Sequence, residues 1–275
     1  MEYKTMAENM KYPRFQEASL PLPTFLPRRR RFGRSAWLVT ALALLWLAAF
    51  QSPALASDPK QELMDLLGRM ESSYAKIVDY CAIFQKKERV KKVLLPEEFI
   101  TLKFRKPLQV YMKWLHGPTK EAIYVDGANS NKVVAHSDGA GAGMTWNLDP
   151  KGSILRADNR HVITDIGFGF IIQMMRENIP TALRHSELGV SDLADTVFEG
   201  RPSTVFEVTF SPKDGRTYYA SRIVCHVDKE FLMPIGITCY DEKGDLVEQY
   251  RYKDVKINVG LTDQDFSKKN PDYKF

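Results

Sequence analysis

The first strong pattern of apolar and polar positions follows Asp58-Pro59. Apolar residues recur there with the spacing of a single helix face, at Leu63, Leu66, Leu67, Met70, Tyr74 and Ile77. A carboxylate at the N-cap followed by proline at the first helical position favours a helix start. The pattern therefore predicts an amphipathic helix that begins at Asp58 and packs its apolar stripe against another apolar surface.

From Tyr80 the apolar period changes from that of a helix to that of a strand. Short alternating runs extend to Leu148 and resume around Thr196. Runs of this kind, separated by Gly, Pro, Asn and Asp, are typical of an antiparallel meander. The pattern is clearest in the last third of the chain, where it predicts strands over residues 221–227, 233–240, 246–252 and 254–259.

A second helix is predicted to open at Thr164-Asp165 and to end near Pro180. Apolar residues occupy most of its surface; they are Ile166, Phe168, Phe170, Ile171, Met174 and Met175. A helix that is apolar nearly all round is expected to be buried. It either covers the open face of a curved sheet or serves as an ordinary core helix, and the pattern leaves both alternatives open.

The N-terminal segment has the layout of an export signal. A basic block at Arg28–Arg34 precedes an apolar run at Ala36–Phe50, and small residues end at Ala56. We therefore expect residues 1–56 to be a leader and export signal, and residues 57–275 to form a single periplasmic domain. An uncleaved segment anchored in the inner membrane is the alternative. The basic block resembles a twin-arginine signal in part, although its residues favour general secretion.

The leader also accounts for the charge of the chain. Residues 1–56 contain eight basic and three acidic residues, and this excess equals the net charge of +5 of the whole chain. The domain that begins at Ser57 therefore carries no net charge. A neutral domain lacks the broad basic surface that nucleic-acid binding requires, so we exclude a nucleic-acid partner.

Catalytic and metal-binding motifs are absent from the sequence. The histidines form no His-Glu-x-x-His or similar pair; they are His116, His136, His161, His185 and His226. No Gly-x-Ser-x-Gly motif occurs. The adjacent Cys225 and His226 would point to opposite faces of a strand. We therefore predict no enzyme, no catalytic residue, no metal site and no cofactor.

Two of the three cysteines flank a predicted hairpin. Cys225 lies seven residues before Leu232, and Cys239 lies seven residues after it. Cross-strand neighbours can approach within disulfide distance, and an oxidising compartment would permit the bond. Two small buried thiols facing the core explain the same pattern, so a disulfide between Cys225 and Cys239 stays one of two alternatives.

The C-terminal residues resemble a known family. The stretch HVDKEFLMPIGITCYDEKGDLVEQYRYKDVKINVGLTDQDF (residues 226–266) is similar to the C-terminal half of the LolA-like lipoprotein-carrier superfamily. The closing LTDQDFSKKNPDYKF resembles the end of domain-of-unknown-function family 1571. The resemblance implies an α+β, mainly β fold: an open, strongly curved antiparallel half-barrel with helices packed on its concave face. In the carriers this concave side holds acyl chains, and related domains act as envelope sensors.

The apolar faces of the predicted strands are the candidate ligand site. On a half-barrel they would line the concave side, and they are Ile100, Leu102, Phe104, Val110, Met112, Trp114, Phe206, Val208 and Phe210. Burial of a hydrophobic ligand there would contribute roughly 0.8 kcal/mol per methylene. The expected partner is a lipid or an acylated protein. A protein of the envelope is the alternative partner, bound by a sensor or interaction domain whose barrel is filled by its own helices. We expect membrane contact only through the signal segment, if it stays uncleaved.

Overall fold

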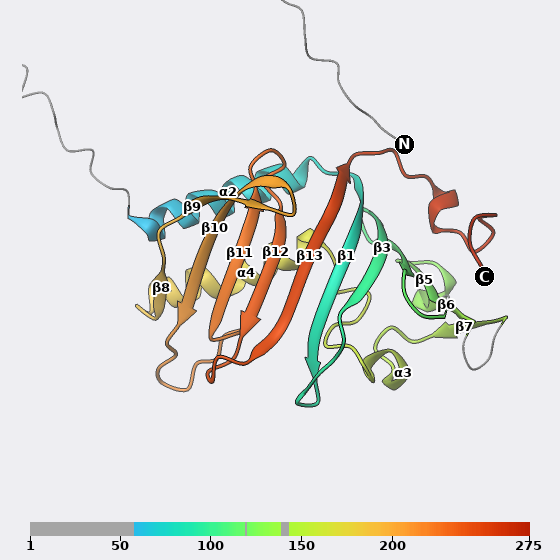
Figure 1. Cartoon of the computed structure of the whole chain (residues 1–275), viewed down its shortest axis with the longest axis horizontal. Coiled ribbons are helices and arrows are strands. Elements are labelled where there is room, and N and C mark those ends of the chain that lie inside the picture. The colour runs from blue at the N-terminus through green and yellow to red at the C-terminus, as the bar shows by residue number, and fades with distance from the viewer. Residues whose placement is uncertain (1–57, 119, 139–142) are drawn as a thin grey trace, which may run out of the picture. The chain divides into compact units, whose positions relative to one another are not determined.

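The computed structural model describes residues 58–118, 120–138 and 143–275. The predicted export signal lies outside these residues. The described residues form a compact unit built on one antiparallel sheet (Figure 1). Within them, no helix is both long enough and apolar enough to cross a membrane.

The sheet contains thirteen strands in the described parts of the chain. Its main path runs β7-β6-β5-β4-β3-β1-β13-β12-β11-β10-β8, while β2 pairs with β1 and β9 pairs with β10. The strands are β1 (Asp79–Val90), β2 (Val93–Leu94), β3 (Glu98–Arg105), β4 (Gln109–Trp114), β5 (Lys120–Val125), β6 (Val133–Ser137), β7 (Met144–Leu148), β8 (Leu188–Val190), β9 (Ala194–Phe198), β10 (Arg201–Phe210), β11 (Arg222–Asp228), β12 (Pro234–Tyr240) and β13 (Leu246–Ile257). Strands β7 and β8 end the path without pairing with each other, so the sheet is open.

Two meanders meet where the last strand, β13, pairs with the first strand, β1. The predicted strands 246–252 and 254–259 form one strand that ends at Ile257, and Asp254, with a φ of +53°, lies at a register shift in its pairing with β1. The pairing brings residues from the two ends of the domain side by side, including Glu88 of β1 opposite Glu248 of β13.

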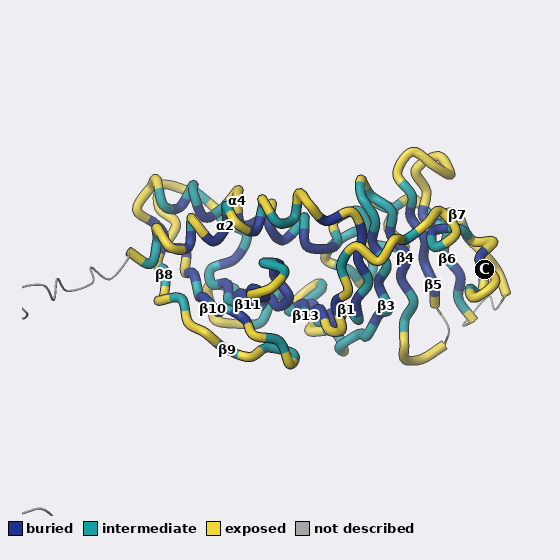
Figure 2. Tube along the Cα trace, turned by 90° about the horizontal axis from the view of Figure 1, so that it is seen from above, coloured by how far each residue is buried: buried dark blue, intermediate teal, exposed yellow. Residues whose placement is uncertain are grey.

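Two long helices cover only part of the sheet. Helices α2 (Pro59–Ala75) and α4 (Phe168–Arg184) pack against each other, and α4 also contacts β8 and β12. Figure 2 shows both helices above the half of the sheet that carries β8 to β13. The predicted fold class, a mainly β, open and curved sheet with helices on one face, is confirmed.

The first helix forms as its pattern predicts. The Asp58 side chain accepts a hydrogen bond of 3.0 Å from the backbone N–H of Lys60 and so caps the helix. Four residues of the apolar stripe are buried; they are Leu63, Leu66, Leu67 and Met70. The helix ends at Ala75, so Ile77 packs in the core from the connection to β1.

The second helix differs from its prediction at both ends. It begins at Phe168, because Gly167 has a φ of +91°, a conformation that ends regular helix on its N-terminal side. It also continues through Pro180 to Arg184, since Ile179 and Ala182 are fully buried and their packing outweighs the lost backbone hydrogen bond. A short helix, α3 (Ser153–Arg156), was not predicted. Two 3-10 turns, η1 (Asn129–Asn131) and η2 (Asp263–Phe266), complete the elements.

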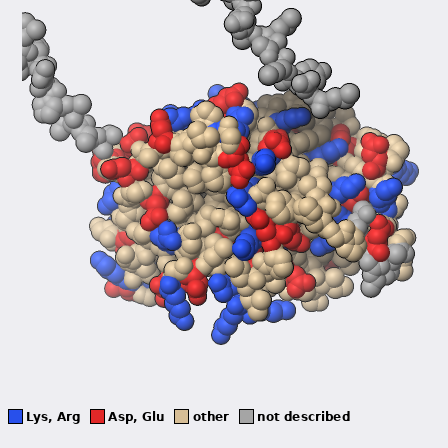
Figure 3. Space-filling model, viewed as in Figure 1, with Lys and Arg blue, Asp and Glu red and all other residues tan. Residues whose placement is uncertain are grey.

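Charged residues are dispersed over one face of the domain. On the face seen in Figure 3, acidic and basic side chains are interspersed and neither sign forms a broad patch. Salt bridges of exposed side chains, such as Arg176–Glu71 at 2.8 Å, contribute about 0–1 kcal/mol each. This surface gives no large field that would steer a highly charged polymer.

Gly167 is expected to be essential for folding. An added Cβ would overlap the Tyr80 hydroxyl oxygen, which accepts a hydrogen bond of 3.3 Å from the backbone N–H of Phe168. We expect Gly167→Ala to lower the free energy of unfolding by more than about 2 kcal/mol. Gly68→Ala is the control, because Gly68 lies inside α2 with nothing within 4 Å of a Cβ. That substitution should raise stability by about 0.5–1 kcal/mol. Equal urea midpoints for the two variants would contradict this account of Gly167.

Candidate functional site

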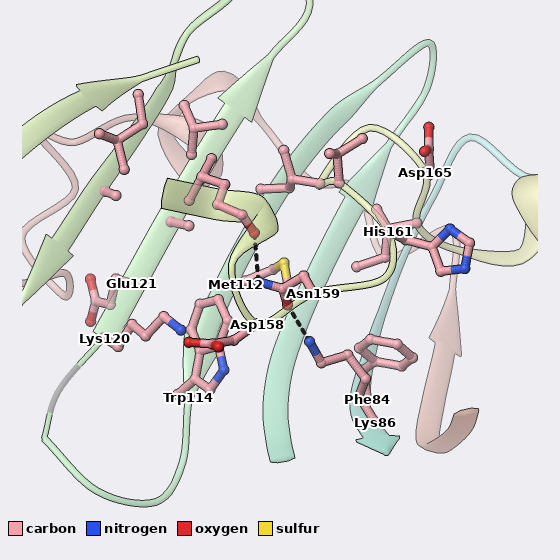
Figure 4. Close-up of a pocket in the computed structure, with 18 of the residues that line it drawn as sticks. Phe84, Lys86, Met112, Trp114, Lys120, Glu121, Asp158, Asn159, His161 and Asp165 are labelled. Atoms are coloured by element: carbon pink, nitrogen blue, oxygen red, sulfur yellow. Dashed lines mark hydrogen bonds between the residues drawn. The ribbon is translucent and has the colours of Figure 1, made fainter. Parts of the chain in front are cut away.

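A cavity of about 430 Å³ lies between the concave face of β4 to β7 and the segment that precedes α4 (Figure 4). We call residues 149–167 the roof segment. The main apolar residues around the cavity are Phe84, Met112, Trp114, Ala122, Val133, Ala135, Trp146, Leu148, Leu155, Val162, Ile163, Ile166, Phe170 and Ile171. Helices α2 and α4 cover the other half of the sheet, and the cavity lies beside them, with Phe170 and Ile171 of α4 in its lining.

The strand register explains why this region is hollow. Met112 of β4 pairs with Ala122 of β5, which pairs with Ala135 of β6, which in turn pairs with Trp146 of β7. Two methyl groups therefore lie between two large side chains in one row across the sheet. We call the row from Met112 to Trp146 the trough. The trough is open because alanine leaves unfilled the space that a larger residue would occupy.

The roof segment supplies the opposite wall of the cavity. Helix α3 contributes Leu155, and the chain that follows it contributes Val162, Ile163 and Ile166. Ile154 also lies at the cavity but is 70% exposed, which marks an opening beside α3. The wall is therefore mixed: apolar side chains alternate with Asp158, Asn159, His161 and Asp165, on largely irregular backbone in place of a long helix.

One end of the cavity is polar. Lys86 of β1 forms an ion pair of 2.9 Å with Glu98 of β3 and a hydrogen bond with Asn159 of the roof segment. Glu98 also accepts a hydrogen bond of 2.8 Å from Trp114 Nε1. Burial would raise the pKa of the Glu98 carboxyl, but the charge and hydrogen bond of Lys86 lower it below its ordinary value. Lys120 completes this end, with its Nζ 4.0 Å from the centre of the Trp114 ring.

Two buried glutamates connect the roof segment to the sheet. Glu88 and Glu248 are 3% and 1% exposed and face each other across the β1–β13 pair. The backbone N–H of Arg160 donates to Glu88 Oε2 at 3.0 Å, and its Nε donates to Glu248 Oε2 at 2.9 Å. His161 Nε2 lies 3.1 Å from the same Glu248 oxygen. We call Glu88, Glu248, Arg160 and His161 the roof anchor.

Tyrosines complete the hydrogen bonding of these carboxylates. Tyr250 donates to Glu88 at 2.5 Å, and Tyr219 donates to Glu248. Burial would raise the pKa of Glu248, but its hydrogen bonds and the charges of His161 and Arg160 lower it below 4.5. Burial and the neighbouring carboxylate raise the pKa of Tyr219, so its hydroxyl stays protonated and keeps donating. The anchor thus holds an ionised Glu248 with its hydrogen-bond partners in place.

The nine predicted ligand-site residues divide between the cavity and the core. Met112 and Trp114 line the cavity. The other seven are at most 5% exposed and belong to the main apolar core; they are Ile100, Leu102, Phe104, Val110, Phe206, Val208 and Phe210. Ligand contact by these nine residues stays a prediction. Of the nine, Met112 and Trp114 are the two that line the cavity. Of the cavity residues that were not predicted, Trp146 and Leu148 alternate in a predicted strand, and this alternation was the available signal.

Cys225 and Cys239 are free thiols in the structure, as is Cys81. Cys225 pairs with Ile237, and Cys239 pairs with Ile223, so the two cysteines are diagonal neighbours on β11 and β12. Diagonal positions are roughly 7–8 Å apart, beyond the usual Cα separation of a disulfide. Both side chains are fully buried, and burial raises the pKa of each thiol. The structure therefore shows the second alternative, two small thiols in the core.

Several other polar residues of the described chain have structural roles. Asp265 accepts a hydrogen bond of 2.7 Å from Lys103, and Asp263 pairs with Arg105, which fixes η2 against β3. His226 stacks on Phe198 with ring centres 4.0 Å apart. Among the described residues, no group of three or more His, Cys, Asp or Glu side chains is placed to hold a metal ion.

Comparison with known proteins gives a family match and remote structural similarities. The model of the family described as "Protein of unknown function (DUF1571)" matches residues 77–275, which confirms the family predicted from the closing residues. No curated protein matches the chain. Among solved structures, MucB in the Pseudomonas aeruginosa MucA/MucB complex has 17% identity and a TM-score of 0.41, covering 74% of this chain and 59% of that chain. The chain thus spans less than two thirds of MucB.

Two further structures carry lipoprotein-sorting or LolA descriptions. A putative outer membrane lipoprotein-sorting protein domain from Vibrio parahaemolyticus has 12% identity and a TM-score of 0.26, covering 74% of this chain and 95% of that chain. A LolA superfamily protein from Nitrosomonas europaea has 11% identity and a TM-score of 0.26, covering 74% of this chain and 97% of that chain.

Proposed function

The chain belongs to the DUF1571 family, and we propose that it is an exported, non-enzymatic protein that binds a hydrophobic ligand, such as a lipid or the acyl chain of a lipoprotein. The ligand would occupy the cavity between the trough and the roof segment. The observation that carries this proposal is the cavity itself: a preformed, largely apolar space between β4 to β7 and the roof segment, bounded on one side by α4.

The size and lining of the cavity fit such a ligand. Its 430 Å³ lies within the range of roughly 300–1,000 Å³ that is typical of small-molecule sites. The trough offers aromatic and thioether groups at its two ends, Trp146 and Met112, and methyl groups between them. Each methylene that moves from water into this space would contribute roughly 0.8 kcal/mol to binding.

The proposed place of action is the periplasm. This part of the proposal rests on the basic and apolar pattern of residues 28–56, which is typical of an export signal. Lipids and acylated proteins of the envelope would then be the available ligands. Their acyl chains are insoluble in the aqueous periplasm, so a protein that shields them has a physical purpose there.

A second candidate function follows from the two helices. Because α2 and α4 already pack on one half of the concave face, that half offers no space for a ligand. A domain filled in this way fits an envelope sensor or a protein-interaction domain. In this second function, the surface of the domain would contact another envelope protein and the remaining cavity would stay empty.

Native mass spectrometry of the exported protein distinguishes the two functions. The protein should be produced with its own leader and purified without detergent. We expect a mass increment of one lipid per chain, with the lipid identified after extraction. An apo mass together with a stoichiometric protein partner would favour the second function. An apo mass that does not change on incubation with lipid vesicles or acylated peptides would overturn the ligand-binding proposal.

A further inference from the structure

We propose that the ligand is a single-chain amphiphile with an anionic head group, a carboxylate or a phosphate. Lys120 would receive the head group, and the chain would lie in the trough over Ala122 and Ala135. This inference rests on the proposed function and adds the chemical class of the ligand to it.

The strand register places Lys120 at the rim of the trough. Lys120 pairs with Ser137 of β6, which pairs with Met144 of β7, one row away from the two alanines. By the strand register, the other side chains on the same face of β4 to β7 as Lys120 are uncharged. Besides the four residues of the trough, these side chains are Val110, Trp114, Tyr124, Val133, Ser137, Met144 and Leu148. Among the described residues of these four strands, Lys120 is thus the lysine of the cavity floor, while Glu121 and His136 also line the cavity.

Two of the neighbouring charges, Lys86 and Glu98, are paired with each other, while Asp158 lies beside Lys120. Glu98 is held by Lys86 at 2.9 Å and by Trp114 Nε1 at 2.8 Å. The Lys120 ammonium lies over the Trp114 ring, and no carboxylate oxygen of the described residues lies within 4.0 Å of it. Figure 4 shows its side chain beside Trp114 and Asp158 at the polar end of the cavity.

The environment of Lys120 favours an anionic partner. Burial lowers the pKa of its ammonium, although Glu98 and Asp158 act on the charge from a distance in the opposite direction. An anion bound at the rim would restore a close counter-charge to this partly desolvated ammonium. The Trp114 ring would at the same time cover the first methylenes of the chain.

The cavity volume favours one chain over two. At about 430 Å³, the space lies toward the lower end of ligand cavities, which run to roughly 1,000 Å³. The trough is one row of small residues wide, since the adjacent rows carry Trp114 on one side and Val133 and Leu148 on the other. A branched, two-chain lipid would need a second row of small side chains beside the first.

Three probes of equal chain length test the inference in the full exported protein: dodecanoate, dodecyl phosphate and the neutral 1-dodecanol. We expect at least one of the anions to bind about three- to tenfold more tightly than the alcohol in titration calorimetry. The anion with the higher affinity identifies a carboxylate or a phosphate source. Lys120→Gln should abolish the preference, whereas Lys120→Arg should keep it.

The control is Lys132→Gln, an exposed lysine in the turn before β6, which should behave like the wild type. Equal affinities for anions and alcohol in the wild type would overturn the head-group inference and leave the hydrophobic site standing. A preference that survives in Lys120→Gln would also overturn it. Binding of none of the three probes would overturn the proposed function together with the inference.

Discussion

An Ala135→Phe variant is expected to fold like the wild type and to lose at least about tenfold in affinity for a hydrophobic ligand. Ala135 lies at the centre of the trough, between Ala122 and Trp146. A phenyl ring there would occupy space that the ligand needs. Ala135 is only partly buried and lines the cavity, so the ring can extend into open space, and the cost of overpacking a core, typically about 1–3 kcal/mol, should be reduced. Phenylalanine also suits a strand.

The test compares affinity and stability in the same preparation. Dodecanoate binding is measured by calorimetry, and the urea midpoint reports the fold. Ala194→Phe provides the matched control, since Ala194 is exposed on β9 at the other end of the sheet. It should bind the probe as the wild type does. Unchanged affinity in Ala135→Phe would show that the ligand does not occupy the trough.

The local elements of this fold could be predicted because their signals are local. The stripe from Leu63 to Met70 determines which face of α2 is buried, and the period-two runs determine the strands. The start of α4 has a different origin. Gly167 and the hydroxyl of Tyr80 set it, and these residues meet only in the folded chain. The helical pattern of one segment cannot predict a contact with a distant residue.

The cavity could not be predicted for a related reason. Its floor depends on the alignment of four strands, and Ala122 and Ala135 are ordinary small residues until the register places them side by side. Sequence patterns identify apolar faces, and a face such as that of Phe206 and Val208 is apolar because it forms the core. The apolar pattern of the strands distinguishes cavity-lining residues from core residues only when the positions of α2 and α4 are known.

The roof anchor was also beyond prediction from the sequence. Glu88 and Glu248 come from opposite ends of the domain and meet through the β1–β13 pairing. In the sequence, each glutamate stands in an alternating strand as an ordinary polar residue. Both side chains instead lie on the covered face, where Arg160 and His161 of the roof segment contact Glu248 and Lys86 lies 3.5 Å from Glu88. Only this tertiary arrangement makes two adjacent buried carboxylates tolerable.

Glu248→Gln should loosen the roof segment and destabilise the domain. The substitution removes the charge that Arg160 and His161 face, while the amide keeps nearly the same shape. Breaking a fully buried ion pair costs about 3–5 kcal/mol. Because the side chain of Arg160 is 33% exposed, we expect a smaller decrease in the free energy of unfolding, about 2–3 kcal/mol. Because both partners belong to the roof segment, dissociation of a bound ligand should also become faster.

The pH dependence gives this prediction a second measurement. Folding lowers the pKa of Glu248. The carboxylate therefore contributes fully to the free energy of unfolding above its ordinary pKa of 4.5, and this contribution is lost as the pH falls through the lower pKa of the folded state. The stability difference between the wild type and Glu248→Gln should therefore be largest near neutral pH and shrink in acid. Glu207→Gln is the control, because Glu207 pairs with Arg222 at the surface at 3.0 Å and should contribute less than about 1 kcal/mol. A Glu248→Gln variant as stable as Glu207→Gln at neutral pH would show that the roof anchor does not hold the roof segment.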